Sequence, residues 1–270
     1  MPTSAAASRS GALLVGVALL AAGCGTSNAQ KAQQVVTETA ANLRTIRSGT
    51  LDLRVTVTPP AGGKPFGRTL SGPFSLRRTG LPIVQMTSTS TAEGRTTRTT
   101  VVSDGTRAFL TKDGVTVELP PAQERQLRRS VRLLAGAGRL ATLRLGTWAV
   151  DPAVFDGGTI DGVETDRVTA RPDVVRATDG LLRLAGLLGL RTAPLPASDR
   201  ARLRRAVRSP RLVLYTGKDD RLLRRLRLTA NLAGDLPPSL GAVLGGTSGG
   251  KLDVELDLAN PNERVTVSNP

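Results

Sequence analysis

The side chains that most often perform chemistry in proteins are scarce in this sequence. Its 270 residues include one cysteine and no histidine, which excludes a histidine-dependent catalytic triad and a zinc site of cysteine and histidine. Ser248 and Lys251 have the Ser-x-x-Lys spacing of penicillin-binding enzymes, but the other motifs of those enzymes do not occur. The acidic pair Asp219 and Asp220 lies in a segment typical of a turn. We therefore expect no enzymatic activity, no metal site and no cofactor.

Cys24 is the single cysteine, and the residues before it explain its position. After Arg9, residues 11–22 form an uncharged run rich in Leu, Ala and Val. This run is shorter than the roughly 20 apolar residues of a membrane-spanning helix and is typical of a signal peptide. Ala22 and Gly23 place small residues next to the thiol, as at a bacterial lipoprotein cleavage site. We therefore predict that Cys24 carries acyl chains, with ordinary secretion of a free thiol as the alternative.

The cleavage site divides the chain into three parts. We expect residues 1–23 to be a signal peptide that is removed, residues 24–30 to be the lipidated cysteine with a polar stalk, and residues 31–270 to be one folded domain. Two or more acyl chains give stable attachment, so the predicted location is the extracytoplasmic face of the cell membrane. Hydrophobic residues make up 39% of the chain and aromatic residues 2%, which predicts an aliphatic core.

The first half of the domain combines one helix with a series of strands. Apolar residues at helical spacing predict an amphipathic helix over residues 31–47. Strict alternation of apolar and polar residues predicts a strand over residues 51–58. Further strands are predicted at residues 68–76, 83–92, 95–103, 106–111 and 115–119, with glycine turns between the last four. These strands predict an antiparallel meander.

The second half repeats this plan less regularly. Helices are predicted at residues 123–145, 179–190 and 199–207, and strands at residues 163–171, 211–216, 223–232 and 251–258, with a last short strand at 265–267. Alternating strands need a cover on their apolar face, and the helices are few and grouped. We therefore expect an α+β fold, with a single curved antiparallel sheet (a half-barrel) and helices packed on its concave face.

Several short segments resemble those of actinobacterial lipoproteins of the LppX/LprAFG type. They are the cleavage site at Cys24, Ser48-Gly49-Thr50, Leu70-Ser71-Gly72-Pro73-Phe74, Ser103-Asp104-Gly105, residues 160–165, residues 215–220 and residues 257–270. The resemblance extends over nearly the whole mature chain. It implies a LolA-like domain, similar to the LolA and LolB carriers, with an apolar cavity for the acyl chains of envelope lipids or glycolipids. Cys24 is the one residue that matches a functional position of the family.

A leucine-rich helix is the best candidate for a wall of such a cavity. Leucines over residues 181–190 surround more than one side of the predicted helix, so the helix is either buried on most sides or touches lipid. The candidate cavity residues are Leu181, Leu182, Leu184, Leu187 and Leu188. The alternative is an ordinary core helix.

A run of arginines follows this helix, in a chain whose formal net charge is +15. Arg200, Arg204 and Arg205 are candidates for contact with lipid headgroups or the membrane surface, where each basic residue gains about 1 kcal/mol beside anionic lipid. The alternative is a solvated helix face decorated with charge. Nucleic acid fits the charge alone, but export and the scarcity of stacking aromatics argue against it.

Together these features predict a membrane-anchored envelope lipoprotein. We expect it to bind a lipid or glycolipid in an apolar cavity and to assist the transport of that lipid. The alternative is a module that binds or senses a protein partner in the envelope and carries no lipid. The sequence names neither the ligand nor the protein partner.

Overall fold

The protein is described from a computed structural model. The model describes residues 27–60, 63–77, 79–135, 144–187, 193–234, 236–237, 240, 244 and 249–267, apart from the side chains of residues 130–135 and 184–187. Cys24 and the predicted signal peptide lie outside the described residues.

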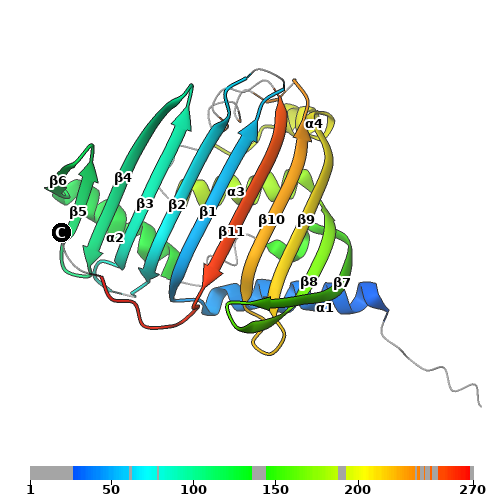
Figure 1. The fold of residues 1–270 in the computed structure, drawn as a ribbon, viewed down its shortest axis with the longest axis horizontal. Helices are drawn as coiled ribbons and strands as arrows, with labels where there is room; N and C mark the ends of the chain where they lie inside the picture. The colour runs from blue at the N-terminus through cyan, green and yellow to red at the C-terminus, as the bar shows by residue number, and fades with distance from the viewer. Residues whose placement is uncertain are drawn as a thin grey trace, which may run out of the picture.

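Eleven strands of the described chain form one open antiparallel sheet (Figure 1). The strands are β1 (Ser48–Thr58), β2 (Phe66–Ser75), β3 (Ile83–Ala92), β4 (Arg95–Asp104), β5 (Ala108–Lys112), β6 (Val115–Glu118), β7 (Ala149–Ile160), β8 (Val163–Pro172), β9 (Val207–Gly217), β10 (Leu223–Leu232) and β11 (Gly250–Ala259). Their order is β6-β5-β4-β3-β2-β1-β11-β10-β9-β8-β7. The sheet is therefore two meanders that join where β1 pairs with β11.

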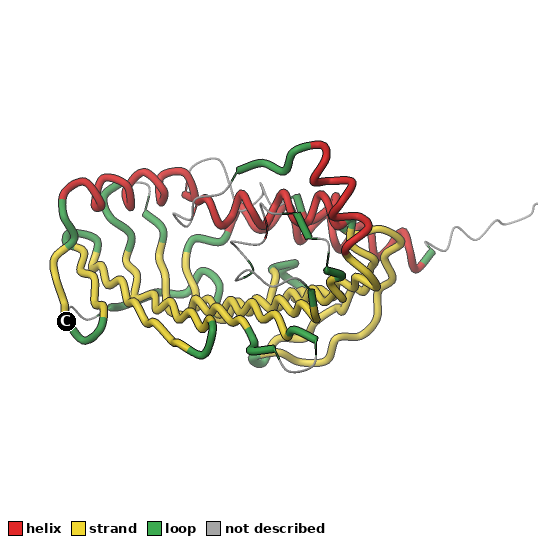
Figure 2. The backbone as a smooth tube through the Cα atoms, turned by 90° about the horizontal axis from the view of Figure 1, so that it is seen from above, coloured by secondary structure: helices red, strands yellow, loops and turns green. Residues whose placement is uncertain are grey.

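The described α-helices all lie on one face of this sheet (Figure 2). They are α1 (Asn28–Asn42), α2 (Pro121–Ala135), α3 (Val174–Leu187) and α4 (Ala197–Ala206), with short 3-10 helices η1 (Leu43–Thr45) and η3 (Leu145–Thr147). We call the face under the helices the inner face and the opposite one the outer face. The predicted α+β fold, a single curved antiparallel sheet with helices on one side, is confirmed.

Helix α1 begins at Asn28 because Ser27 caps it. The Ser27 hydroxyl accepts a hydrogen bond from the Gln30 backbone, and the Gln30 side chain accepts one from the Ser27 backbone, which is a capping box. The Asn28 side chain exchanges two hydrogen bonds of 2.9 Å with the backbone of Val154 on β7. Residues 28–30 therefore belong to the helix, and the polar stalk expected over residues 24–30 ends at Ser27.

The main core lies between α1 and the inner face of strands β8 to β11. Val36 of α1, Leu212 of β9 and Trp148 are fully buried within it, and most of its other members are Leu, Val and Ala. One polar contact crosses it, where the Thr39 hydroxyl donates to the backbone oxygen of Val35 and lies 3.0 Å from the hydroxyl of Thr216. The predicted aliphatic core is present in this half of the sheet.

Some differences between the predicted and the observed elements have local physical reasons. The helix expected over residues 123–145 does not continue through Leu145, because Arg144 has a left-handed backbone with φ of 47°. No strand is described at residues 265–267, since β1 is already paired on both sides, by β2 and β11. Strand β7 was not predicted, because bulges near Pro152 and Gly157 interrupt its alternation.

Candidate functional site

A row of apolar side chains, interrupted only at β2, crosses the inner face from the centre of the sheet to its β6 edge. Near the centre of the sheet, Leu51 on β1 pairs with Leu258 on β11. Toward the β6 edge, successive strands pair four more residues in one line: Met86 on β3, Val101 on β4, Leu110 on β5 and Val117 on β6. We call these six residues the apolar track. Side chains at directly paired positions point to the same face of a sheet, so the track is one line of aliphatic groups.

Where the track crosses β2, the residue in line with it is Gly72, which has no side chain. Its φ of +142° favours glycine, and a Cβ at this position would lie 1.9 Å from the backbone oxygen of Gln85. No other residue fits there without a shift of β3. The track therefore has a gap between Leu51 and Met86, where the backbone of β2 itself forms the surface.

Burial differs between the two ends of the track. Leu258 is 5% exposed and belongs to the main core, whereas Val117 is 49% exposed. The four residues between them are only partly buried, and none belongs to a buried cluster of the described residues. Helices α2 and α3 nevertheless lie over this part of the sheet (Figures 1 and 2). These four residues thus form an apolar surface that is not part of the described core.

The length of the track fits a long hydrocarbon chain. From β11 to β6 it crosses six strand intervals, or about 29 Å at about 4.8 Å each. The roughly 30 Å hydrocarbon core of a bilayer is filled by two acyl chains end to end, so the track is long enough for one complete acyl chain. An acyl chain needs aliphatic contact and no fixed polar partners, which is what this row offers.

A polar row runs beside the track on the same face. Ser88, Thr99 and Lys112 pair in register across β3, β4 and β5. Among the described residues no hydrogen bond links the hydroxyls of Ser88 and Thr99, although on the outer face Thr87 and Thr100 bond to each other at 3.0 Å. These inner hydroxyls are available to the polar part of a bound molecule.

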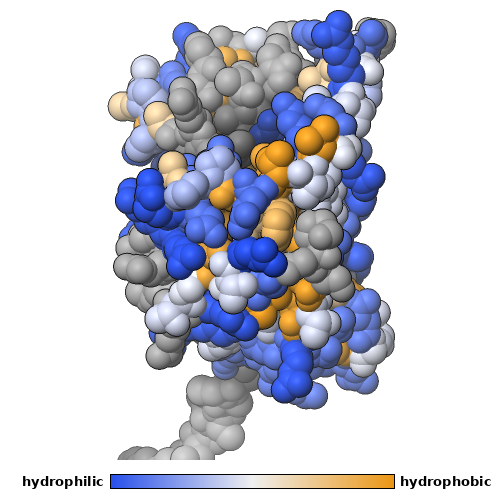
Figure 3. Space-filling view, turned by 90° about the vertical axis from the view of Figure 1, so that its left-hand side faces the viewer, coloured by the Kyte–Doolittle hydropathy of each residue, from blue (hydrophilic) through white to orange (hydrophobic). Residues whose placement is uncertain are grey.

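The β6 end of the track is open to solvent. Val115 and Val117 are 65% and 49% exposed, and they are two of the three exposed large hydrophobic residues of the described chain. Figure 3 looks onto this end of the molecule and shows apolar residues gathered in a band between polar surfaces. A hydrocarbon chain can therefore reach the inner face from this edge.

The leucines predicted to line a cavity occupy two different environments. Leu182 is buried in a small cluster of α3 and α4 with Val175 and Leu203, and Leu181 packs against the main core. The side chains of Leu184 and Leu187, and the whole of Leu188, lie outside what the structure describes. At the two described positions the helix packs into the core. Contact with a ligand stays a prediction for these leucines.

The predicted membrane-contact arginines lie on α4, at the strand ends opposite α1 (Figure 1). Arg200 forms an ion pair of 3.5 Å with Asp179 on α3, so it holds two helices together. Arg204 and Arg205 are exposed in the last turn of α4, where a positive charge complements the helix dipole. Their contact with a membrane stays a prediction.

The structure places the described residues that were considered for catalysis in a turn and on a strand of the sheet. Asp219 and Asp220 lie in the turn between β9 and β10, and Asp220 accepts a hydrogen bond from the backbone of Leu222 at 2.9 Å. Lys251 is on the outer face of β11, and Ser248 lies outside the described residues. Within the described chain no three potential metal ligands gather, and no helix is long and apolar enough to cross a membrane.

Comparison with solved structures gives the fold a known counterpart. LprF from Mycobacterium bovis aligns over 89% of this chain and 97% of its own, with a TM-score of 0.50 and 15% sequence identity. The chain has the fold of LprF. LppX from Mycobacterium tuberculosis aligns over 88% of this chain and 98% of its own, with a TM-score of 0.42 and 12% identity. No protein-family model and no curated protein matches the chain.

The apolar track escaped prediction although every strand that carries it was expected. Within this LprF fold, alternation assigns Met86, Val101 and Leu110 to one face of each strand, but it does not say which residues of neighbouring strands lie opposite. That information depends on the register of the hairpins, which the turns at Glu93-Gly94 and Asp113-Gly114 fix. Counting residues outward from each turn gives the register of the hairpin, and the register identifies the residues of the track.

Proposed function

We propose that this protein is a membrane-anchored envelope lipoprotein that binds a lipid or glycolipid and assists its transport. In this proposal an acyl chain lies along the apolar track under α2 and α3. The polar part of the lipid meets the hydroxyls of Ser88 and Thr99. The observation that carries the proposal is the half-buried aliphatic row that ends at an exposed edge.

The physics of the track suits a carrier. Burying a methylene group from water contributes about 0.8 kcal/mol, so an acyl chain of ten or more methylenes is held firmly against water. A membrane interior is as apolar as an aliphatic slot. The net free energy of moving the chain between the two is therefore small, and the lipid can be released to another membrane.

The lipid anchor that the sequence predicts at Cys24 also supports this proposal. Acyl chains on Cys24 hold the domain at the membrane surface, where its lipid is found. Because Ser27 caps α1, at most about 11 Å of extended chain separates Cys24 from the helix cap. The domain then stays close to the leaflet.

A non-carrier envelope module is the second candidate, and strand β6 favours it. This edge strand exposes Val115 and Val117, and an exposed edge strand is a template for pairing with another chain. In that case the protein binds or senses a protein partner, and lipid exchange is absent.

Transfer between vesicles separates the two candidates. A soluble chain that begins at Ser27 is mixed with donor vesicles that contain a fluorescent phospholipid and with unlabelled acceptor vesicles. We expect the protein to accelerate transfer. Met86→Glu places a carboxylate in the track, where burial of an unpaired charge costs several kcal/mol, and returns transfer to the rate without protein.

Gln85→Glu is the matched control. It adds the same charge one residue away, on the exposed outer face of β3, and keeps the wild-type rate. A wild-type chain that does not accelerate transfer, and that crosslinks to one protein at high yield, contradicts the carrier and favours the partner module.

A further inference from the structure

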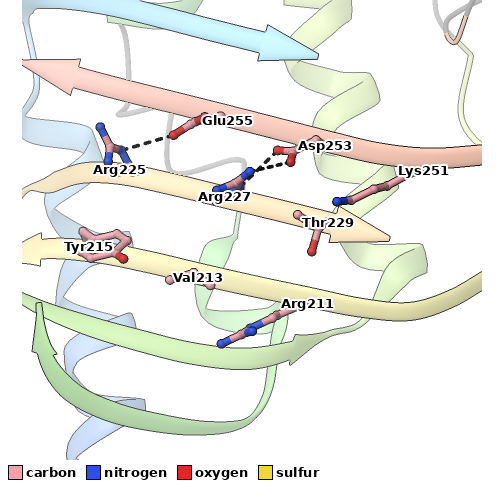
Figure 4. A pocket seen from close by; sticks show the side chains of 9 residues that line it. All are labelled: Arg211, Val213, Tyr215, Arg225, Arg227, Thr229, Lys251, Asp253 and Glu255. Atoms are coloured by element: carbon pink, nitrogen blue, oxygen red, sulfur yellow. Dashed lines mark hydrogen bonds and ion pairs between the residues drawn. The ribbon is translucent and has the colours of Figure 1, made fainter. Parts of the chain in front are cut away.

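The outer face of the sheet carries a hollow that the lipid carrier does not use. Its volume is about 350 Å³, and it lies over β9, β10 and β11 (Figure 4). The lining residues are Arg211, Val213, Tyr215, Arg225, Arg227, Thr229, Lys251, Asp253 and Glu255. These residues alternate along their strands with Leu212, Leu228 and Val254 of the main core, so the sheet separates the hollow from the inner face.

Two of the four cations in the hollow are held by carboxylates. Arg227 donates two hydrogen bonds to Asp253, of 2.7 and 3.3 Å. Arg225 hydrogen-bonds Asp257 and forms an ion pair of 3.5 Å with Glu255. The bond to Asp257 raises the pKa of Arg225, and the bonds to Asp253 raise the pKa of Arg227. These two guanidinium groups form a fixed, charge-compensated floor.

The other two cations, Arg211 and Lys251, have no hydrogen-bond or ion-pair partner in the part of the chain that is described, and both are exposed. Strand β10 lies between them: its Thr229 pairs with Arg211 on β9, and its Asn231 pairs with Lys251 on β11. Figure 4 shows the two cations on opposite sides of the hollow, Arg211 on β9 and Lys251 on β11, with β10 between them. Arg211 and Lys251 are therefore the two lining cations that no carboxylate of the described residues pairs with.

This combination has the chemistry of a site for a phosphate ester. A phosphate carries up to two negative charges, and arginine and lysine both bind it through charge-assisted hydrogen bonds. Asp253, Glu255 and the Thr229 hydroxyl keep lone pairs that accept hydrogen bonds from hydroxyl groups. Val213 and Tyr215 supply an apolar surface at the other end. The volume is at the small end of ligand pockets, which fits one sugar ring and its phosphate.

We propose that the outer hollow over β9, β10 and β11 binds a phosphorylated sugar. The phosphate lies between Arg211 and Lys251, and the ring hydroxyls meet Thr229 and the two carboxylates. The same chemistry is presented by a soluble sugar phosphate and by the headgroup of an inositol lipid. The proposal is independent of the apolar track and of the carrier function.

Calorimetric titration of the full chain in detergent tests this site with glucose 1-phosphate, glucose and inorganic phosphate. We expect saturable binding of glucose 1-phosphate and at least tenfold weaker binding of the other two. In the double variant Arg211→Ala/Lys251→Ala the affinity falls about a hundredfold, because each lost charge-assisted hydrogen bond is equivalent to about a tenfold change. Arg98→Ala, on the outer face of β4, keeps the wild-type affinity.

Mixed micelles with phosphatidylinositol identify the source of the ligand. Binding of both probes with loss in the double variant supports a site open to soluble and lipid-borne sugars, and binding of phosphatidylinositol alone with that loss supports a headgroup site. No saturable binding, an equal loss in Arg98→Ala, or inorganic phosphate that binds as tightly as glucose 1-phosphate overturns the proposal. The thermal unfolding midpoint of each variant confirms that it folds.

Discussion

Arg224 is the one charged residue among the described side chains that is buried, with 5% of its surface exposed. It forms an ion pair with Asp220, four residues earlier in the chain, while its Nε and Nη1 atoms have no partner. A buried cation with unsatisfied donors is destabilising unless its partner compensates for lost water. Asp220 therefore matters less for the turn it occupies than for the charge it balances.

The two partners of this pair are expected to respond differently to substitution. Arg224→Met removes the buried charge and its orphaned donors, so the free energy of unfolding should stay within about 1 kcal/mol of wild type or rise. Asp220→Asn leaves the cation uncompensated and should lower the free energy of unfolding by about 1–3 kcal/mol. This loss is smaller than for a fully buried pair, because Asp220 is 40% exposed. Urea denaturation measures both, and a larger loss in Arg224→Met contradicts this reading of the pair.

Single strands show which parts of the fold the sequence determines. Strands β3 and β10 were predicted with their observed limits, because unbroken alternation and flanking turns fix both ends. Strand β7 was missed because Pro152 and two glycines interrupt its pattern at its bulges. The pairing of β1 with β11 joins the chain's first and last strands, and no local signal announces a contact so distant in sequence. The apolar track depends on such pairings between strands. The sequence therefore predicts the strands that carry the track but not the track itself.

Strand β6 should act as the opening through which lipid enters and leaves the track. Val115→Ser/Val117→Ser removes apolar surface from the exposed end only. If each valine contributes about 1 kcal/mol to the first contact with an acyl chain, lipid uptake should slow at least fivefold. Stopped-flow fluorescence with a labelled phospholipid measures this rate. Thr116→Ala on the outer face of β6 is the control, and equal rates in all three proteins argue for a different entrance.

The whole molecule places the proposed anchor and the open end of the track at opposite edges of the sheet. Helix α1 is bound to β7 through Asn28 and Val154, and β6 lies ten strand intervals away, or about 48 Å along the sheet. With Cys24 acylated, the β7 edge is held at the leaflet. We expect the β6 edge to lie farther from that membrane, in a position to pass lipid onward.

Fluorescence transfer to a membrane-surface acceptor tests this orientation. Cysteine is introduced by Phe155→Cys on β7 or by Val117→Cys on β6. The label attaches there alone if Cys24, the one native cysteine, carries the proposed acyl chains. Both native side chains are exposed to a similar degree, 47% and 49%. A label at position 155 should transfer energy more strongly than one at position 117. Equal transfer, or stronger transfer at position 117, rules out this orientation.

The central claim is that the inner face holds a lipid, and the most direct measurement is the lipid content of the protein itself. The full chain is purified from its native membrane, extracted with organic solvent and analysed by mass spectrometry, with Met86→Glu in parallel. We expect about one lipid per wild-type chain in addition to the anchor, and none in Met86→Glu. A wild-type chain that releases no lipid into the solvent, or equal lipid from both proteins, contradicts the claim.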